Sequence, residues 1–170
     1  MKYKIVKLSK FSGVEAKIYS IYLPEHSETL FDIFIKENIN SFKSELKDIF
    51  NRLSGIGKHT GARESFFKLF EGKPGDGVCA LYDLPEKALR LYCIRYGSLI
   101  LILGGGGPKS KKIKALQDDN KLTQENYFLR QVAKEIREKM ELGEIEISKD
   151  GTEFLGNLEF SDYEEEQEQS

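Results

Sequence analysis

The 170-residue chain is poor in the residues that build disulfide frameworks and metal sites, since it has only two cysteines and two histidines. Cys79 and Cys93 lie within apolar stretches and do not form a C-x-x-C pair, so they are predicted to be small buried side chains in a reducing compartment. His26 and His59 have no partners at metal-ligand spacing. We therefore expect neither a metal ion nor any other cofactor.

Long hydrophobic runs are also absent. No stretch approaches the roughly 20 apolar residues that cross a bilayer. The first ten residues, MKYKIVKLSK, alternate charge and do not form the apolar core of a signal peptide. The sequence thus predicts a cytoplasmic protein with no membrane partner. It also lacks the P-loop pattern and the nucleophile motifs of serine and cysteine enzymes.

What the chain does have is an uneven distribution of charge. Charged residues make up 32% of the chain and the net charge is only −2. Residues 85–114 nevertheless hold seven bases and one acid, whereas residues 161–170 hold five acids and no base. Nucleic-acid binders show such asymmetry, and a solvated charged surface produces it too. The prediction is a single domain over residues 1–160, followed by a disordered acidic tail.

Alternation of apolar and polar residues predicts an α+β fold built on an antiparallel sheet. Residues 2–8 and 15–24 alternate on either side of Gly13, which predicts an N-terminal β-hairpin. Residues 99–103 are all aliphatic and predict a central strand that is buried on both faces. The expected meander around it consists of strands over 78–84, 88–96 and 98–104.

Helices are expected to cover one face of this sheet, which has four or more strands. Residues 28–54 carry two apolar stripes, which predict a helical hairpin or one kinked helix with Ser27 as its N-cap. A second helix is predicted near 123–142. The glycine-dotted stretch 55–77 predicts a mobile lid or an insertion, and residues 144–160 predict a last hairpin.

The basic residues near the meander are the main candidates for function. Arg90 and Arg95 fall on opposite faces of one predicted strand, so at least one of them lies on an open face beside Tyr92 or Tyr96. Guanidinium groups pair phosphates and aromatic rings stack bases, which suits RNA. The alternative is an arginine paired with a carboxylate on a solvated face.

Three further features leave alternatives open. The run Gly104–Gly107 lets backbone N–H groups approach a phosphate, but no helix start follows it directly, and we expect a flexible strand exit instead. The lysines that follow, from Lys109 to Lys114, form either a phosphate-tracking cluster or a solvated charge run. His59 is either a solvated loop residue or a general acid or base.

Residues 89–112, LRLYCIRYGSLILILGGGGPKSKK, place an arginine near the start of a strand, a tyrosine at its end, and an aliphatic strand that leads into lysines. Together with the preceding helical hairpin, this order resembles the RelE/HigB-type toxins of bacterial toxin–antitoxin systems, especially their phage-derived branch. The resemblance covers residues 28–116. It implies a RelE-like fold, with a helix-turn-helix antitoxin and the ribosome with its mRNA as partners.

The activity that the resemblance implies is that of an mRNA interferase. Such enzymes cleave mRNA at the ribosome by attack of a ribose 2′-OH on the adjacent phosphate, which needs a base, an acid and cations but no metal. Under this hypothesis Arg90 stabilises the phosphate, and Tyr96 acts as acid or base, with His59 as the alternative to Tyr96. The expected RNA-binding residues are Tyr92, Arg95, Lys109, Lys111 and Lys112.

One difference from the family favours an alternative function. Residues 80–84, Ala-Leu-Tyr-Asp-Leu, carry no arginine where the family pattern has one. This favours a catalytically inactive RNA- or antitoxin-binding module on the same fold. A third hypothesis is an accessory protein without any nucleic-acid role, in which the charges serve only for solvation.

Deletion of residues 161–170 is expected to tighten RNA binding, because the acidic tail competes with RNA for the basic residues. The measurement is the dissociation constant of a single-stranded oligoribonucleotide, determined by fluorescence anisotropy for the full and the shortened chain. An unchanged constant would leave the tail as a solubilising end.

Overall fold

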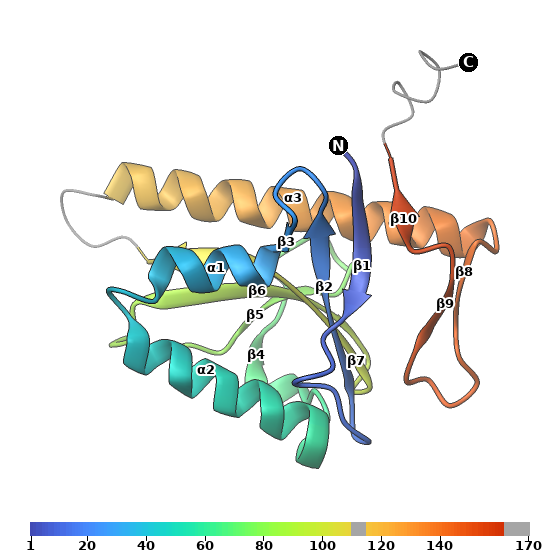
Figure 1. Cartoon of the computed structure of the whole chain (residues 1–170), viewed down its shortest axis with the longest axis horizontal. Helices are drawn as coiled ribbons and strands as arrows, with labels where there is room; N and C mark the ends of the chain where they lie inside the picture. The colour runs from blue at the N-terminus through green and yellow to red at the C-terminus, as the bar shows by residue number, and fades with distance from the viewer. Residues whose placement is uncertain (110–114, 162–170) are drawn as a thin grey trace.

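The computed structural model describes residues 1–109 and 115–161, except for the side chains of residues 115–119. The predicted tail beyond Ser161 lies outside the described residues. Its main sheet has the strand order β10-β1-β2-β7-β6-β5-β4, with β3 paired to β2 (Figure 1). The strands are β1 Tyr3–Lys7, β2 Lys17–Leu23, β3 Glu28–Thr29, β4 Phe67–Lys68, β5 Val78–Leu81, β6 Leu89–Tyr96, β7 Ile100–Pro108 and β10 Glu159–Phe160. The helices are α1 Leu30–Asn38, α2 Lys43–Gly55 and α3 Ala115–Glu141. The α+β class is confirmed.

The sheet is mixed, so the prediction of a purely antiparallel sheet is wrong. The hairpin β1–β2 and the meander β5–β6–β7 are antiparallel as expected. These two units join through β2 and β7, which run parallel from the pair Lys17–Ile100 to the pair Ser20–Leu103. A parallel pair requires a long crossover connection, and the segment between β2 and β7, which contains α1 and α2, provides it.

The central position of β7 is confirmed. Residues Ile100–Leu103 are fully buried, with β2 on one side and β6 on the other. Ser20 links β7 to α1 by hydrogen bonds. Its hydroxyl donates to the carbonyl of Leu103 (2.8 Å) and accepts from the N–H of Phe31 (3.3 Å). The buried hydroxyl therefore has partners on both β7 and α1.

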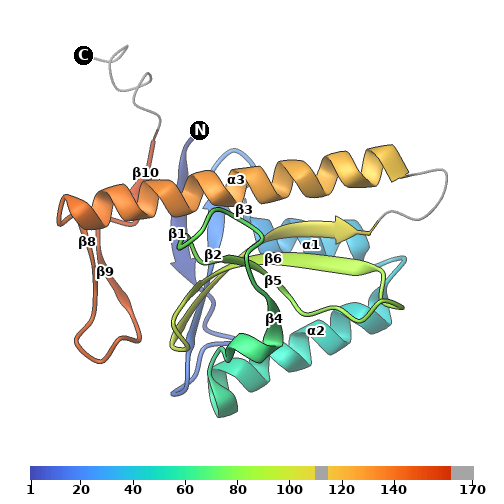
Figure 2. The ribbon, with the colours of Figure 1, turned by 180° about the vertical axis from the view of Figure 1, so that it is seen from behind.

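Helices cover both faces of the sheet, which corrects the prediction that all of them lie on one face. Figure 1 shows α1 and α2 on one side, and Figure 2 shows α3 crossing the other. The reason lies in β6, whose two faces are both apolar. Leu91 and Cys93 pack toward α1 and α2, while Tyr92 and Ile94 pack toward α3. A sheet that is apolar on both faces needs cover on both.

The stretch 28–54, predicted as a helical hairpin or one kinked helix, forms two separate helices. The N-cap of the first is Thr29 instead of Ser27. The Thr29 hydroxyl accepts from the N–H of Asp32 (3.0 Å), and the Asp32 carboxylate accepts from the N–H of Thr29 (3.1 Å). This reciprocal pair satisfies two backbone donors at the helix start. Ser27 has a φ of 53° and belongs to the preceding turn. The other predicted helix begins earlier than expected, at Ala115.

The glycine run is part of β7 and not a flexible strand exit. Gly104 and Gly105 lie opposite Tyr92, where the register of β6 and β7 shifts by one residue, as in a β-bulge. A Cβ atom at Gly104 would lie 2.9 Å from the Leu129 side chain of α3, and one at Gly106 would lie 1.9 Å from the carbonyl oxygen of Arg90. Glycine at 106 is therefore required for β6 to pair with β7, and glycine at 104 lets the Leu129 side chain of α3 lie close to the sheet.

The segment predicted as a lid is more ordered than expected, and the predicted last hairpin is confirmed. Residues 55–77 contain a π-helical turn, Ile56–Thr60, and the edge strand β4. After α3, strands β8 Ile145–Ile147 and β9 Phe154–Gly156 form a separate hairpin, and β10 joins the main sheet beside β1. Among the described residues no helix combines the length and apolar character needed to cross a membrane.

Gly106→Ala is expected to lower the free energy of unfolding by about 1–3 kcal/mol, because the new methyl group meets the backbone of β6. The adjacent Gly107→Ala is the matched control, since the atoms nearest its Cβ are 3.7 Å away. Urea unfolding of both variants provides the measurement. Equal stabilities would contradict the role given to Gly106.

Candidate functional site

Three cationic side chains meet at one buried carboxylate, that of Asp83. The Lys109 Nζ lies 2.5 Å from Asp83 Oδ2, the Lys68 Nζ 3.2 Å from Oδ1, and the Arg90 Nη2 3.7 Å from Oδ2. We refer to these four residues as the Asp83 cluster. The cluster has two more positive charges than negative ones.

The pairing of the strands brings these residues together. Lys68 of β4 is paired with Ala80, three residues before Asp83. Arg90, at the start of β6, is paired with Gly107, and the backbone N–H of Lys109 donates to the carbonyl of Ala88 (2.6 Å). The residues that follow β5 thus lie where three other strand segments meet: the start of β6, the end of β7 and the edge strand β4.

The electrostatics of the cluster favour an ionised Asp83. Burial by itself raises the pKa of a carboxylate, but Lys109, Arg90 and Lys68 outweigh it and hold the pKa of Asp83 below its ordinary value of 3.8. The Asp83 side chain is 6% exposed, whereas the three cationic side chains are 17–33% exposed. The carboxylate is therefore the most buried member of the cluster, and the three cationic side chains around it are partly exposed.

The structure brings together two of the predicted site residues, Arg90 and Lys109, and places Tyr92 beside them. The Arg90 guanidinium lowers the pKa of the Tyr92 hydroxyl, although burial dominates and leaves that pKa raised. Tyr92 is 5% exposed, so its ring packs in the core toward α3 and has no open face for a base. Arg90 is the half-exposed member of this pair.

Tyr96 and His59 lie at the other end of the sheet from Arg90. Arg90 and Tyr96 are six residues apart on β6, which corresponds to about 20 Å. Tyr96 packs edge-on against Phe154, with ring centres 5.2 Å apart, and burial raises the pKa of its hydroxyl. His59 is exposed in the π-helical turn, next to the segment whose Ala62 N–H binds the carbonyl of Ser98.

Arg95 lies on the opposite face of β6 from Arg90, as the alternation along the strand predicts. Its Nε donates to the carbonyl of Ala62 (2.6 Å), and its Nη1 lies 3.8 Å from the exposed carboxylate of Glu64. Arg95 therefore fastens the segment after the π-helical turn. Lys111 and Lys112, also expected to bind RNA, lie outside the described residues.

Sequence reasoning missed Asp83 and Lys68. The signal for Asp83 was an acidic residue between Tyr82 and Leu84, at the end of a predicted strand that leads into Pro85. An acid in such a place has to find cationic partners or remain in water. Nothing in the sequence around Lys68 indicated its pairing, because that pairing depends on the register of β4 against β5.

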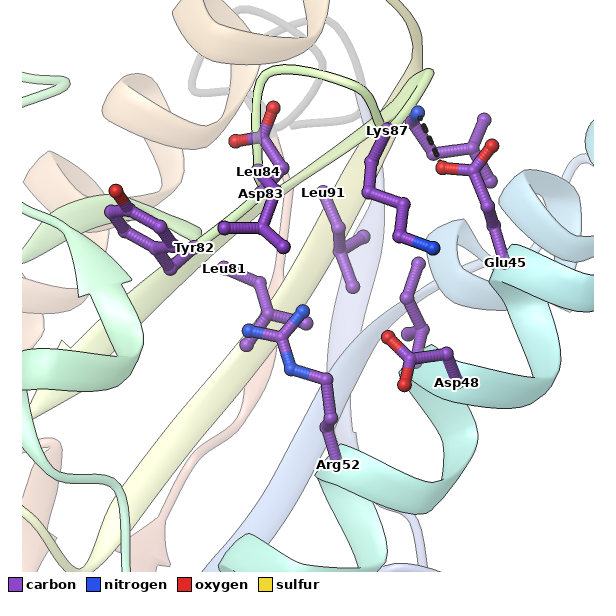
Figure 3. Close-up of a pocket in the computed structure, with 11 residues that line it drawn as sticks. Glu45, Asp48, Arg52, Leu81, Tyr82, Asp83, Leu84, Lys87 and Leu91 are labelled. Carbon is purple, nitrogen blue, oxygen red and sulfur yellow. Dashed lines mark hydrogen bonds between the residues drawn. The ribbon is translucent and has the colours of Figure 1, made fainter.

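A pocket of about 190 Å³ adjoins the cluster on the side of α2 (Figure 3). Its floor is apolar, with Leu81, Leu89 and Leu91, and Asp83 also lines it. In Figure 3 the Arg52 side chain reaches from α2 toward the strand that holds Leu81, whereas the Asp83 carboxylate points away from α2. Glu45 closes one end, where its carboxylate accepts from the N–H of Ala88 (2.8 Å).

The chemistry that this arrangement can perform is anion binding. Three cationic side chains that are held in place and partly exposed suit a phosphate or a carboxylate. In the part of the chain that the structure describes, no group of three or more histidine, cysteine, aspartate or glutamate side chains is arranged to hold a metal ion.

Asp83→Asn is expected to lower the free energy of unfolding at pH 7 by about 3 kcal/mol, because three cations lose their buried counter-charge. Since the folded protein lowers the pKa of Asp83, the ionised carboxylate stabilises the fold above pH 3.8, and this contribution is lost as the pH falls through the lowered pKa. The difference between the variant and the wild type should therefore shrink below pH 3.8. Urea unfolding at pH 7 and pH 3 measures it.

The matched control is Asp48→Asn, which removes an exposed carboxylate of α2. Its effect on the free energy of unfolding should stay within about 0.5 kcal/mol at both pH values. A difference for Asp83→Asn that does not change between pH 7 and pH 3 would show that the charge of Asp83 is not what stabilises the cluster.

Comparison with known proteins identified no relative of this chain. No family model, curated protein or solved structure matches it.

Proposed function

We propose that the protein is an RNA-binding module of the toxin–antitoxin type, and that the Asp83 cluster holds the RNA backbone. The observation that carries this proposal is the convergence of Lys68, Arg90 and Lys109 on a single carboxylate. RelE-like topology and an origin among bacterial toxins belong to the proposal, and rest on the sequence resemblance.

The excess of positive charge is what makes the cluster a binding site and not only a structural ion pair. One carboxylate neutralises one of three cations, and the three cationic side chains are 17–33% exposed. Phosphate groups would neutralise the other two, and a guanidinium offers them paired donors. The chain leaves β7 through Lys109 into a segment with three more lysines, which extends the positive charge along the sequence.

Binding is favoured over cleavage by the positions of the groups that would move protons. A general acid or base has to reach the reacting atoms within hydrogen-bond distance. Tyr96 lies about 20 Å along β6 from Arg90, and burial raises the pKa of its hydroxyl. His59 lies at the same far end.

A metal-independent mRNA interferase is the second candidate, and one observation favours it. Arg90 and Lys109 lie together, as the stabilisation of a phosphate in the transition state requires. Inducible expression in a bacterium, with Arg90→Ala as the control, tests this candidate. Growth inhibition that depends on Arg90, together with cleaved mRNA, would support the enzyme. Absence of both would leave the binding module.

The protein partner that the resemblance implies is a helix-turn-helix antitoxin. An acidic segment of that partner would occupy the same cations as RNA, so the two ligands should compete for the Asp83 cluster. This follows from charge complementarity, because a carboxylate and a phosphate both satisfy Lys68, Arg90 and Lys109.

Single-stranded RNA is expected to bind with a strong salt dependence, and Lys68→Ser and Lys109→Ser should each weaken it. Each lost phosphate contact reduces the slope of log affinity against log salt by about 0.7. Lys149→Ser, in the turn of the β8–β9 hairpin, is the matched control and should leave the slope unchanged. Anisotropy titrations between low and physiological salt measure the slope. Affinity that does not respond to salt or to the two cluster variants would refute the proposal.

A further inference from the structure

Three exposed aromatic rings belong to segments that hydrogen bonds join near the β4–β5 edge of the sheet. Among the described residues, the exposed aromatic side chains are those of Phe70 (85%), Tyr127 (60%) and Tyr82 (44%). Phe70 follows β4, and Tyr82 follows β5 with its N–H bound to the carbonyl of Phe66 (2.7 Å). Tyr127 adjoins Asn126 of α3, whose side chain donates to the carbonyl of Glu71 (2.9 Å). We call these three rings the aromatic edge.

Phe70 is held in an unfavourable backbone conformation without burial of its ring. Its φ is 65°, in the left-handed region that bulky residues rarely occupy. The next residue, Glu71, fixes this geometry, because its N–H donates to Val78 and its carbonyl accepts from Asn126. A strained residue that presents an apolar ring to solvent is typical of a binding surface, since packing does not compensate for it.

Cations flank the aromatic edge and connect it with the Asp83 cluster. The Lys68 ammonium lies 5.7 Å from the centre of the Tyr82 ring and also 3.2 Å from Asp83 Oδ1. The Arg130 guanidinium lies 5.2 Å from the centre of the Tyr127 ring. Lys68 therefore belongs to both surfaces, and the positive charge runs on from the Asp83 cluster to the rings.

We propose that the aromatic edge stacks the bases of single-stranded RNA whose phosphates are held by Lys68, Arg130 and the Asp83 cluster. This inference rests on the proposed RNA-binding function. A single strand alternates bases with phosphates, and the aromatic edge likewise has rings next to cations. An aromatic ring can stack on any of the four bases. A duplex is excluded from this mode because its bases are stacked on one another. The protein should therefore prefer single-stranded over double-stranded RNA and show little sequence preference.

The test uses the full chain and three fluorescent ligands of equal length. These are a single-stranded oligouridylate, the same backbone with abasic residues, and an RNA duplex. The wild type is expected to bind the oligouridylate roughly tenfold or more tightly than the abasic strand. Phe70→Ala and Tyr127→Ala should each weaken oligouridylate binding by roughly tenfold and leave binding of the abasic strand and the salt slope unchanged.

Two further variants separate stacking from folding. Phe70→Tyr retains a ring and should bind as the wild type does, whereas Leu142→Ala removes an exposed apolar side chain at the far end of α3 and should change nothing. Equal binding of the oligouridylate and the abasic strand by the wild type, or unchanged binding by Phe70→Ala and Tyr127→Ala, would overturn the stacking inference alone. Failure of the wild type to bind any of the three ligands would overturn the proposed function and this inference with it.

Discussion

The close contact between α3 and the glycine run of β7 is the constraint on which both candidate surfaces depend. A side chain at Gly104 or Gly105 would meet Leu129 or Glu125 of α3. With glycine there, the helix lies on the strand, and its Asn126 reaches the backbone of Glu71. The same glycines continue β7 to Pro108, which delivers the next residue, Lys109, to Asp83. The contact of α3 with the glycine run thus positions the aromatic edge, and the continuation of β7 positions Lys109 in the Asp83 cluster.

In the Asp83 cluster, a carboxylate offsets the repulsion between three cations that lie near the ends of strands. Like charges repel, so Lys68, Arg90 and Lys109, which the strand pairing brings together, are stabilised there by a buried carboxylate that attracts all three. The carboxylate fixes their geometry but does not neutralise them. An anionic ligand therefore finds its cations already ordered, which lowers the cost of binding. Tyr96, which was expected to act as acid or base, lies about 20 Å from Arg90 along β6, and His59 lies at the same far end of the sheet.

Local patterns in the sequence predicted the strands better than their arrangement. The alternation along β6 placed Arg90 and Arg95 on opposite faces, and the aliphatic run identified the central strand, as the structure confirms. The parallel pairing of β2 with β7 could not be predicted, because it depends on a contact between residues about 80 positions apart. The glycine run was misinterpreted for a related reason, since its purpose is visible only when α3 lies on it. The pairing of Arg90 with Asp83 likewise depends on tertiary structure.

We propose that RNA binds along one continuous surface, from the Asp83 cluster to the aromatic edge. The most direct measurement is a map of backbone amide chemical shifts in the 15N-labelled full chain during titration with a single-stranded oligoribonucleotide. The expected shift changes are concentrated at residues 66–73, 81–90, 107–109 and 126–130, and no change is expected in the π-helical turn at 56–60. Changes centred on that turn, or no changes at saturating RNA, would contradict this proposal.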